Sequence, residues 1–343
     1  MSSDKKASSE ALSTSSYFAL GAFLLSLLSS ERGFHSERAQ KPVLENVHLL
    51  PHEIYEPQDK PVSPLPAIVF LHGWPDDVAM FRPFAKHLSK RFRCVNCNLP
   101  GYPVPEGFQG NPGSLPQRTW GYGLDEAALA LKNTILATCQ DAATVTLVVH
   151  DWGAICGYLM HEQNPDLVQR IVGLDVGWRM NGMTIPGGAG IIAYQAFLNL
   201  FFLMPKSIGS TLSNIEAILL ARFWDKDAGP VTSEMNWPYR SAWRDMLTGG
   251  PLKRMDGYVP KDLPFLFLYG ERLPAFIRFS DEQWVKNVEK TCPGVSRVKS
   301  FDGSHWFLRK FPDEVLKTID EWLVESEPHM PPRRRSLIST AKL

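Results

Sequence analysis

The sequence predicts an α/β fold in which a mostly parallel β-sheet carries helices on both faces and is interrupted by an inserted helical cap. Short, continuously apolar runs alternate with segments of helical spacing along most of the chain. The alternation stops at residues 179–258, where apolar helical patches and aromatic-rich turns replace it, and it resumes afterwards. Such alternation predicts parallel strands, because a parallel pair needs a crossover connection that is usually a helix.

Four expected strands precede the interruption. Each is mostly apolar, which is typical of parallel strands that are buried on both faces. The strands are Ala67–Leu71, Cys94–Leu99, Val145–His150 and Ile171–Val176. Between them, apolar residues recur at three- and four-residue spacing, which predicts helices on the faces of the sheet. These helices are Phe81–Arg91, Leu124–Gln140 and Ala154–His161.

After the interruption, the same pattern closes the core. We expect strands at Pro264–Tyr269 and Arg297–Phe301 and a last helix at Pro312–Val324. One core with an inserted cap accounts for this order more economically than two separate domains do. The expected regions are an N-terminal extension at 1–40, the core at 41–178 and 259–327, the cap at 179–258, and a C-terminal tail at 328–343.

Charge and cysteine content exclude several classes of protein. Lys plus Arg and Asp plus Glu both number 36, so no basic excess is available to neutralise nucleic-acid phosphates. The five cysteines are an odd number, which argues against a disulfide framework and favours a reducing compartment. Cys94 and Cys97 form a C-x-x-C inside an apolar run, so we expect buried strand residues there. No phosphate-loop, dinucleotide or zinc-protease motif is present, and we expect no cofactor or metal.

Two segments bear on the location of the protein. Residues 17–30 form an apolar stretch that is too short to span a bilayer comfortably. This stretch fits a helix packed on the domain, contact with a membrane surface, or a signal peptide. The terminal Ala341-Lys342-Leu343 resembles the S-K-L peroxisomal signal. We therefore expect recognition by the peroxisomal import receptor and a peroxisomal location, with the cytoplasm as the alternative.

The segment VTLVVHDWGA joins an apolar strand to the start of a helix at residues 145–154. The turn between them matches the nucleophile elbow, which presents one side chain at the carboxyl end of the sheet. That side chain is Asp151, where serine is usual. A carboxylate that attacks a saturated carbon forms an alkyl ester, which water then hydrolyses. Epoxides and alkyl halides are the natural substrates for such an attack.

This HDWGA segment resembles the nucleophile segment of the epoxide hydrolases and haloalkane dehalogenases of the α/β-hydrolase fold, and the resemblance extends over residues 65–325. Val149 departs from the glycine that epoxide hydrolases usually carry two residues before the nucleophile, and it is closer to the dehalogenases. The resemblance implies a small lipophilic substrate that binds under an apolar cap.

Two further motifs fit the same family. The segment Leu71-His72-Gly73-Trp74-Pro75 is similar to its H-G-x-P motif, and an aromatic x is typical of epoxide hydrolases. The resemblance implies that the backbone N–H groups of Trp74 and Trp152 form the oxyanion hole. Near the carboxyl end, Gly303-Ser304-His305-Trp306 follows an expected strand, in the place of the family's catalytic base, which implies that His305 is that base.

The third catalytic residue, the acid that would pair with His305, is less directly indicated by the sequence. The family pattern G-x-x-D-P corresponds here to residues 270–274 and has Leu273 in the place of the aspartate. Asp175 ends an expected strand 24 residues after Asp151, and some dehalogenases take their acid from that strand end. We therefore assign the acid to Asp175, with Glu271 as the alternative. A purely structural role for Asp175, as a loop cap, also stays open.

The cap carries two tyrosines that resemble the acids with which epoxide hydrolases protonate the oxirane oxygen. Tyr194 lies in a Y-Q pattern, and Tyr239 lies in Asn236-Trp237-Pro238-Tyr239-Arg240, where Pro238 is an insertion relative to the usual N-W-Y-R. The leading hypothesis is an epoxide hydrolase. A dehalogenase would bind halide through Trp152 and a second indole from Trp178, Trp224 or Trp237. An inactive hydrophobic-ligand binder is the third hypothesis, because of Val149 and Leu273.

Overall fold

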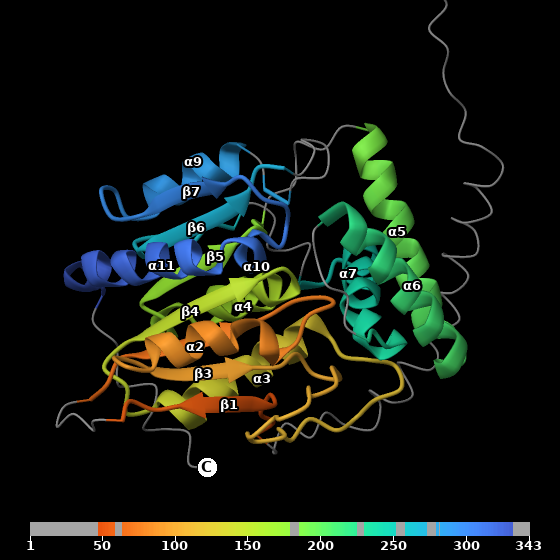
Figure 1. Cartoon of the computed structure of the whole chain (residues 1–343), viewed down its shortest axis with the longest axis horizontal. Coiled ribbons are helices and arrows are strands. Elements are labelled where there is room, and N and C mark those ends of the chain that lie inside the picture. The colour runs from red at the N-terminus through yellow and green to blue at the C-terminus, as the bar shows by residue number, and fades with distance from the viewer. Residues whose placement is uncertain are drawn as a thin grey trace, which may run out of the picture.

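A parallel sheet runs through the core of the computed structural model (Figure 1). The structure describes residues 47–58, 64–178, 185–224, 230–251, 258–272, 279–280 and 282–331. Within these residues seven strands pair in the order β1-β3-β2-β4-β5-β6-β7. The strands are β1 (His52–Tyr55), β2 (Ala67–Leu71), β3 (Arg93–Cys97), β4 (Val145–His150), β5 (Arg170–Leu174), β6 (Phe265–Gly270) and β7 (Arg297–Phe301). Only β1 among them pairs antiparallel, at the edge beside β3.

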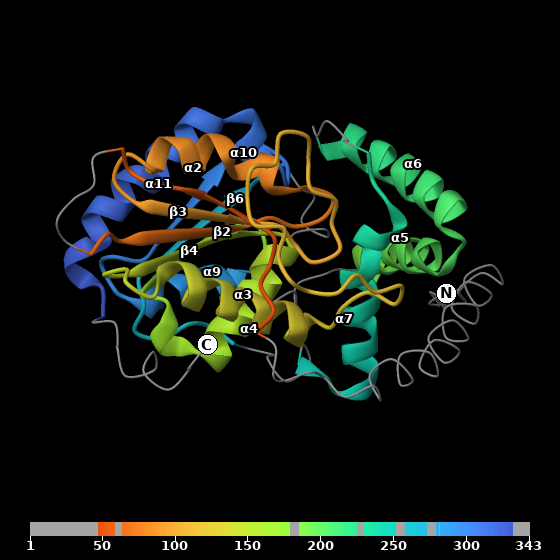
Figure 2. The same ribbon diagram turned by 90° about the horizontal axis from the view of Figure 1, so that it is seen from below.

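Helices cover both faces of this sheet (Figure 2). One face carries α2 (Arg82–Leu88), α10 (Phe307–Lys310) and α11 (Pro312–Ser326), and the other carries α3 (Leu124–Cys139), α4 (Trp152–Gln163) and α9 (Glu282–Thr291). Successive strand residues point to opposite faces. In β2, Ile68 and Phe70 join the core under α2 and α11, while Val69 and Leu71 join the core under α3 and α4. The expected α/β fold is therefore confirmed.

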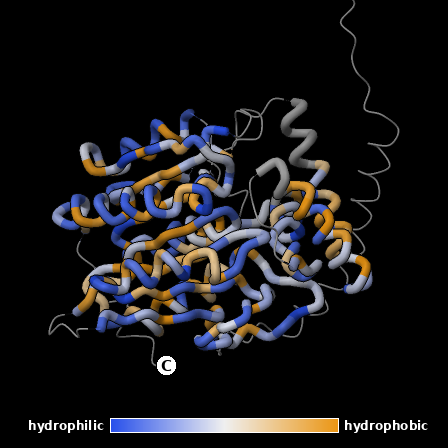
Figure 3. The backbone as a smooth tube through the Cα atoms, viewed as in Figure 1, coloured by the Kyte–Doolittle hydropathy of each residue, from blue (hydrophilic) through white to orange (hydrophobic). Residues whose placement is uncertain are grey.

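The interruption of the alternating pattern corresponds to helices at the carboxyl ends of the strands (Figure 1). They are α5 (Ile185–Leu203), α6 (Lys206–Trp224) and α7 (Trp237–Thr248), and a short 3-10 turn at Ser233–Asn236 precedes α7. Figure 3 shows apolar stretches on the described parts of α5 and α6. No helix of the described residues is long and apolar enough to cross a membrane. Residues 17–30 lie outside the described part of the chain.

Hydrogen bonds between distant parts of the chain tie the described part of the cap to the core. Trp74 Nε1 donates to Asn236 Oδ1 over 3.0 Å, and Trp237 Nε1 donates to the Pro100 carbonyl over 2.7 Å. The Leu124 amide donates to Ser241 Oγ over 3.1 Å. Pro238 lies in the first turn of α7, where its missing N–H leaves no helical hydrogen bond unmade. These contacts hold α7 over the edge at which the parallel strands end.

Several element boundaries differ from the prediction by a few residues. The strand expected at Cys94–Leu99 ends at Cys97, because the Leu99 amide turns to donate to His72 Nε2 over 3.1 Å. The strand expected at Ile171–Val176 ends at Leu174, because Asp175 adopts a left-handed conformation with φ 64°. The helix expected at Phe81–Arg91 is shorter, since α2 spans Arg82–Leu88 and a 3-10 turn precedes it.

The cysteines match the prediction. All five are free thiols, and Cys94 and Cys97 are buried in β3. These two side chains lie on opposite faces of the sheet, one in each hydrophobic core. Side chains on opposite faces of one strand cannot form a disulfide or share a metal ion.

Candidate active site

Asp151 stands at a sharp turn between β4 and α4, with φ 50° and ψ −126°. This conformation is rare for a non-glycine residue and is typical of strained functional turns. Two glycines leave room for it. A Cβ on Gly73 would lie 2.2 Å from Asp151 Oδ1, and a Cβ on Gly153 would lie 2.2 Å from the Leu71 carbonyl oxygen. The local sequence therefore requires glycine at both places for the carboxylate to reach its position.

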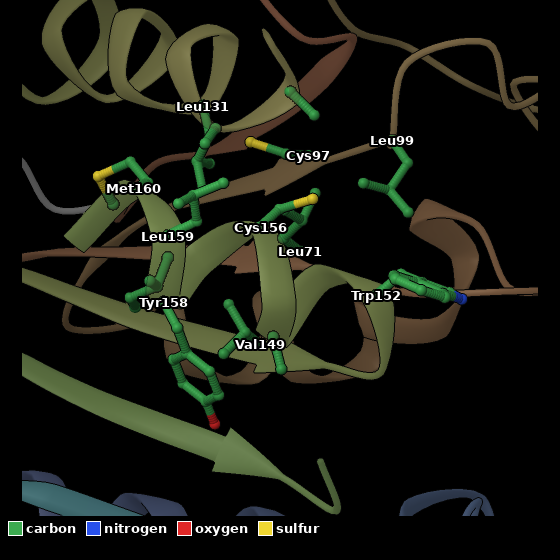
Figure 4. Close-up of a cluster of buried hydrophobic side chains, with 14 of the residues drawn as sticks. Leu71, Cys97, Leu99, Leu131, Val149, Trp152, Cys156, Tyr158, Leu159 and Met160 are labelled. Carbon is green, nitrogen blue, oxygen red and sulfur yellow. The ribbon is translucent and has the colours of Figure 1, made fainter. Parts of the chain in front are cut away.

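Val149 packs behind this turn, in the buried cluster between β4 and α4 (Figure 4). A Cβ on Gly157 of α4 would come within 2.8 Å of its Cγ1 atom. The absence of a side chain at Gly157 thus makes room for the valine. The departure from the family's usual glycine changes the packing under the elbow and does not alter the side chain that the elbow presents.

Backbone N–H groups surround the Asp151 carboxylate. The Trp74 amide donates to Oδ1 over 2.6 Å. Burial raises the pKa of Asp151 to about 6, against the opposing effects of His305 and of the Trp152 and Trp74 amides. The amide groups expected at the oxyanion hole therefore both act on Asp151.

His305 lies between the carboxylates of Asp151 and Asp175. Its Nδ1 atom is 2.6 Å from Asp175 Oδ2, and its Nε2 atom is 3.6 Å from Asp151 Oδ2. Burial acts to lower the pKa of His305, but the hydrogen bond and charge of Asp175, with the charge of Asp151, raise it above its usual value. His150 Nε2 donates to the His305 carbonyl over 3.1 Å, and the two rings lie 4.4 Å apart. The ring is thus held on both sides and turns Nε2 toward Asp151.

Asp175 holds its place through strained backbone and a second hydrogen bond. Its left-handed φ of 64° turns the chain at the end of β5, and its Oδ1 atom accepts from the Gly270 amide over 2.9 Å. The alternative acid, Glu271, is exposed and accepts a hydrogen bond from Ser300 Oγ. The structure therefore brings Asp175, and not Glu271, to His305. Leu273 lies outside the described residues.

Aromatic side chains from core and cap meet at Tyr239. Its ring contacts Trp74 at 5.6 Å, Trp152 at 5.0 Å and Tyr194 at 6.0 Å, each edge to face. Burial raises the pKa of both phenols, and the negative charge of Asp151 adds to this effect in each. Gln195 Nε2 donates to the Tyr194 hydroxyl over 3.3 Å. The two cap tyrosines therefore lie together beside the carboxylate and are protonated at neutral pH.

The three tryptophans that could supply a second halide donor lie in different surroundings. The Trp237 indole N–H already donates to the Pro100 carbonyl, and Trp178 is buried just after the end of β5. The side chain of Trp224 is outside the described part of the structure. Within the described ranges, no group of three or more His, Cys, Asp or Glu residues is arranged to hold a metal ion.

Sequence reasoning missed Asp76, which lies near the site. Asp76 accepts hydrogen bonds from Trp306 Nε1 and from Arg309, so it connects the segment after Pro75 to the segment after His305. Its signal in the sequence was its place directly after the H-G-x-P motif. His72, within that motif, has a structural role, because its Nε2 atom lies 2.7 Å from Asn98 Oδ1.

Comparison with known proteins identifies the family. Residues 66–310 match the α/β hydrolase fold family, to which the chain belongs. It is an enzyme of that family. Over 286 residues it is 23% identical to a haloalkane dehalogenase of Mycolicibacterium smegmatis, covering 76% of this chain and 85% of that protein.

Epoxide hydrolases are also among the similar proteins. The chain is 28% identical over 107 residues to epoxide hydrolase 1 of Caenorhabditis elegans, covering 31% of this chain but only 24% of the nematode protein. The crystal structure of a Bacillus megaterium epoxide hydrolase in complex with an inhibitor superposes with a TM-score of 0.56 at 20% identity, covering 80% of this chain and 96% of that one. These likenesses support the fold and the hydrolase class.

Proposed function

We propose that this protein hydrolyses a lipophilic epoxide to a diol through an alkyl ester on Asp151. In the first step Asp151 Oδ2 attacks a ring carbon, and the carbon–oxygen bond breaks with its electron pair left on the oxygen. Oδ2 suits this role because Oδ1 is held by the Trp74 amide over 2.6 Å. Tyr194 or Tyr239 donates the proton that the alkoxide needs.

In the second step, water hydrolyses the ester. His305 Nε2 removes a proton from the water, whose oxygen attacks the Asp151 carboxyl carbon. The 3.6 Å between Nε2 and Oδ2 is longer than a direct hydrogen bond, and it places Nε2 close enough for a water bonded to it to reach the carboxyl carbon of Asp151. Oδ1 then carries the negative charge toward the amides of Trp74 and Trp152. Breaking the ester bond leaves an alkoxide, which takes the proton of the new Asp151 carboxyl group and departs as the diol. The protonated His305 returns its proton to the tyrosinate that the first step formed, so all the groups are restored.

The observation that carries this proposal over dehalogenation is the pair of phenols beside Asp151, of which Tyr239 is buried and Tyr194 is half-buried. A ring oxygen stays attached to the product and must be protonated, whereas a halide leaves as a stable anion and needs N–H donors. Trp237, one of the possible indole donors, is already bonded to the Pro100 carbonyl. The Trp152 and Tyr239 rings pack edge to face at 5.0 Å. Because an indole N–H can only donate, the Trp152 side chain does not compete for the phenol hydrogen, which can point at an epoxide.

Removing both phenols tests the choice between the two reactions. The double variant Tyr194→Phe/Tyr239→Phe is expected to lower the rate of diol formation by about 10²- to 10⁴-fold, since each well-placed donor is worth ~3 kcal/mol. The measurement is diol formation from a panel of aryl and fatty-acid epoxides, beside halide release from alkyl halides.

A matched control is Tyr122→Phe. This buried tyrosine contacts Trp237 of the cap, at 5.6 Å between rings, but its hydroxyl donates to the Pro116 carbonyl. Its loss should leave diol formation unchanged. If the wild type releases halide, opens no epoxide, and loses nothing in the double variant, the dehalogenase replaces the epoxide hydrolase. If the wild type forms no ester with either class of reagent, the protein is a binder.

The raised pKa of Asp151 predicts a pH dependence of ester formation. Only the ionised carboxylate is a nucleophile, and burial raises its pKa to about 6, so acidification protonates it earlier than an ordinary aspartate. The single-turnover rate of ester formation should be constant well above pH 6 and should fall about tenfold per pH unit below it. A rate that stays constant down to the pKa of an ordinary aspartate, near about 4, would contradict this.

For location, we propose peroxisomal import through Ala341-Lys342-Leu343, which lies outside the described residues. Import receptors read such a terminal tripeptide as an address. A fluorescent protein fused in front of residues 328–343 should collect in peroxisomes, and the same fusion without the last three residues should stay in the cytoplasm. Equal distribution of both fusions would exclude the signal.

A further inference from the structure

Asp76 is a buried carboxylate beside the site that the proposed mechanism does not use. Its side chain is 0% exposed, although an aspartate is seldom fully buried without partners. Oδ2 accepts from Trp306 Nε1 over 2.8 Å, and Oδ1 accepts from Arg309 Nη2 over 2.5 Å. Both partners come from a part of the chain 230 or more residues away. The two contacts satisfy a charge whose burial would otherwise be costly.

The two segments that Asp76 joins each carry a different catalytic group. The Asp76 amide donates to the Gly73 carbonyl over 2.9 Å and closes the turn from which the Trp74 N–H reaches Asp151. Trp306 directly follows His305, and their rings lie 4.8 Å apart. The carboxylate therefore bonds the oxyanion-hole turn to the residue next to the base.

We propose that Asp76 is a positioning residue, which holds the Trp74 amide and His305 at a fixed separation through Trp306 and Arg309. The inference rests on the proposed function, because it concerns hydrolysis of the ester on Asp151. Asp76 acts on the distance between the oxyanion hole and the base.

This role affects the two half-reactions unequally. Attack on the epoxide needs the Asp151 carboxylate and the cap phenols, so it does not use His305 as a base. Hydrolysis of the ester needs the base and the N–H donors at once, on opposite sides of the same carbonyl carbon. A displacement of about 1 Å between two catalytic groups is enough to cost on the order of 10²-fold. Loosening the connection should therefore slow hydrolysis more than ester formation, and the ester should accumulate.

Three substitutions separate the contacts. Trp306→Phe keeps the ring but removes the N–H, Asp76→Asn keeps an acceptor oxygen but removes the charge, and Asp76→Leu removes both. Single-turnover quenching with intact-protein mass spectrometry measures formation and decay of the ester. We expect Trp306→Phe to slow decay by about tenfold and Asp76→Leu by about 10²-fold, with formation changed much less. Asp76→Asn should fall between wild type and Asp76→Leu.

Asp302→Asn is the matched control. Asp302 forms a similar pair with Arg272, over 2.7 Å, but both side chains are exposed. Its loss should leave both half-reactions within about twofold of wild type, as is usual for surface ion pairs. If Asp76→Leu does not fold, the rates of ester formation and decay in Trp306→Phe and Asp76→Asn still test the proposal.

Two results would overturn the proposal while leaving the proposed function intact. One is wild-type ester decay in both Trp306→Phe and Asp76→Asn. The other is an equal loss in formation and decay, which would indicate a general structural role. If the wild type forms no ester with any epoxide or alkyl halide, the proposed function fails, and the positioning role fails with it.

Discussion

His305→Gln is expected to stop the enzyme after its first half-reaction. Glutamine occupies similar space but cannot accept a proton from water, whereas Asp151 keeps the Trp74 amide and its attacking oxygen. Ester formation should continue, and ester hydrolysis should fall by about 10²- to 10⁴-fold. Intact-protein mass spectrometry after incubation with an epoxide should then show a species heavier by the mass of one substrate. Peptide mapping should place the added mass on Asp151.

The double variant Asp151→Asn/His305→Gln controls for reaction elsewhere on the protein. It should carry no adduct, because an amide oxygen is a far weaker nucleophile than a carboxylate. A single His305→Gln variant that turns over normally would remove His305 from the mechanism. An adduct of the same size in both variants would move the nucleophile away from Asp151.

Asp175→Asn is expected to have a similarly large effect, because it changes the hydrogen bonds that Asp175 makes. One carboxylate oxygen accepts from the Gly270 amide over 2.9 Å, and the other accepts from His305 Nδ1 over 2.6 Å. An asparagine must keep its oxygen toward the Gly270 N–H, so its NH₂ group turns toward His305. The imidazole must then accept at Nδ1 and carry its proton on Nε2. That tautomer cannot remove a proton from water, and turnover should fall by about 10³- to 10⁴-fold.

Glu271→Gln is the matched comparison, since Glu271 was the alternative acid. Its carboxylate is exposed and bonds to Ser300, so the substitution should leave steady-state turnover within about twofold. Circular dichroism of both variants would check that they fold. A strong loss in Glu271→Gln together with normal turnover in Asp175→Asn would transfer the acid to Glu271.

Much of the fold could be predicted because strand and helix periodicity are local properties. β2 and β4 have the boundaries that their apolar runs predicted, and the family assignment to the α/β hydrolases is confirmed. The ends of β3 and β5 could not be predicted. They depend on contacts made across the fold, by His72 with the Leu99 amide and by the left-handed turn at Asp175. Periodicity alone carries no information on either.

The sequence by itself determined the local geometry of the turn that presents the proposed nucleophile. Asp151, the glycines beside it and the strand–turn–helix order lie within one short segment, so their mutual geometry follows from local backbone rules. The same holds for the Trp74 turn, which directly follows β2.

Only the tertiary structure decided which distant groups meet. Asp175 and His305 are 130 residues apart, and they contact each other because β5, β6 and β7 are neighbours whose carboxyl ends reach the same edge of the sheet. Asp76 and Trp306 are 230 residues apart and bond across that same edge. Tyr194 and Tyr239 converge because α5 and α7 pack together above it. Sequence spacing does not predict such pairs, because the order of strands in the sheet and the docking of the cap set their distances.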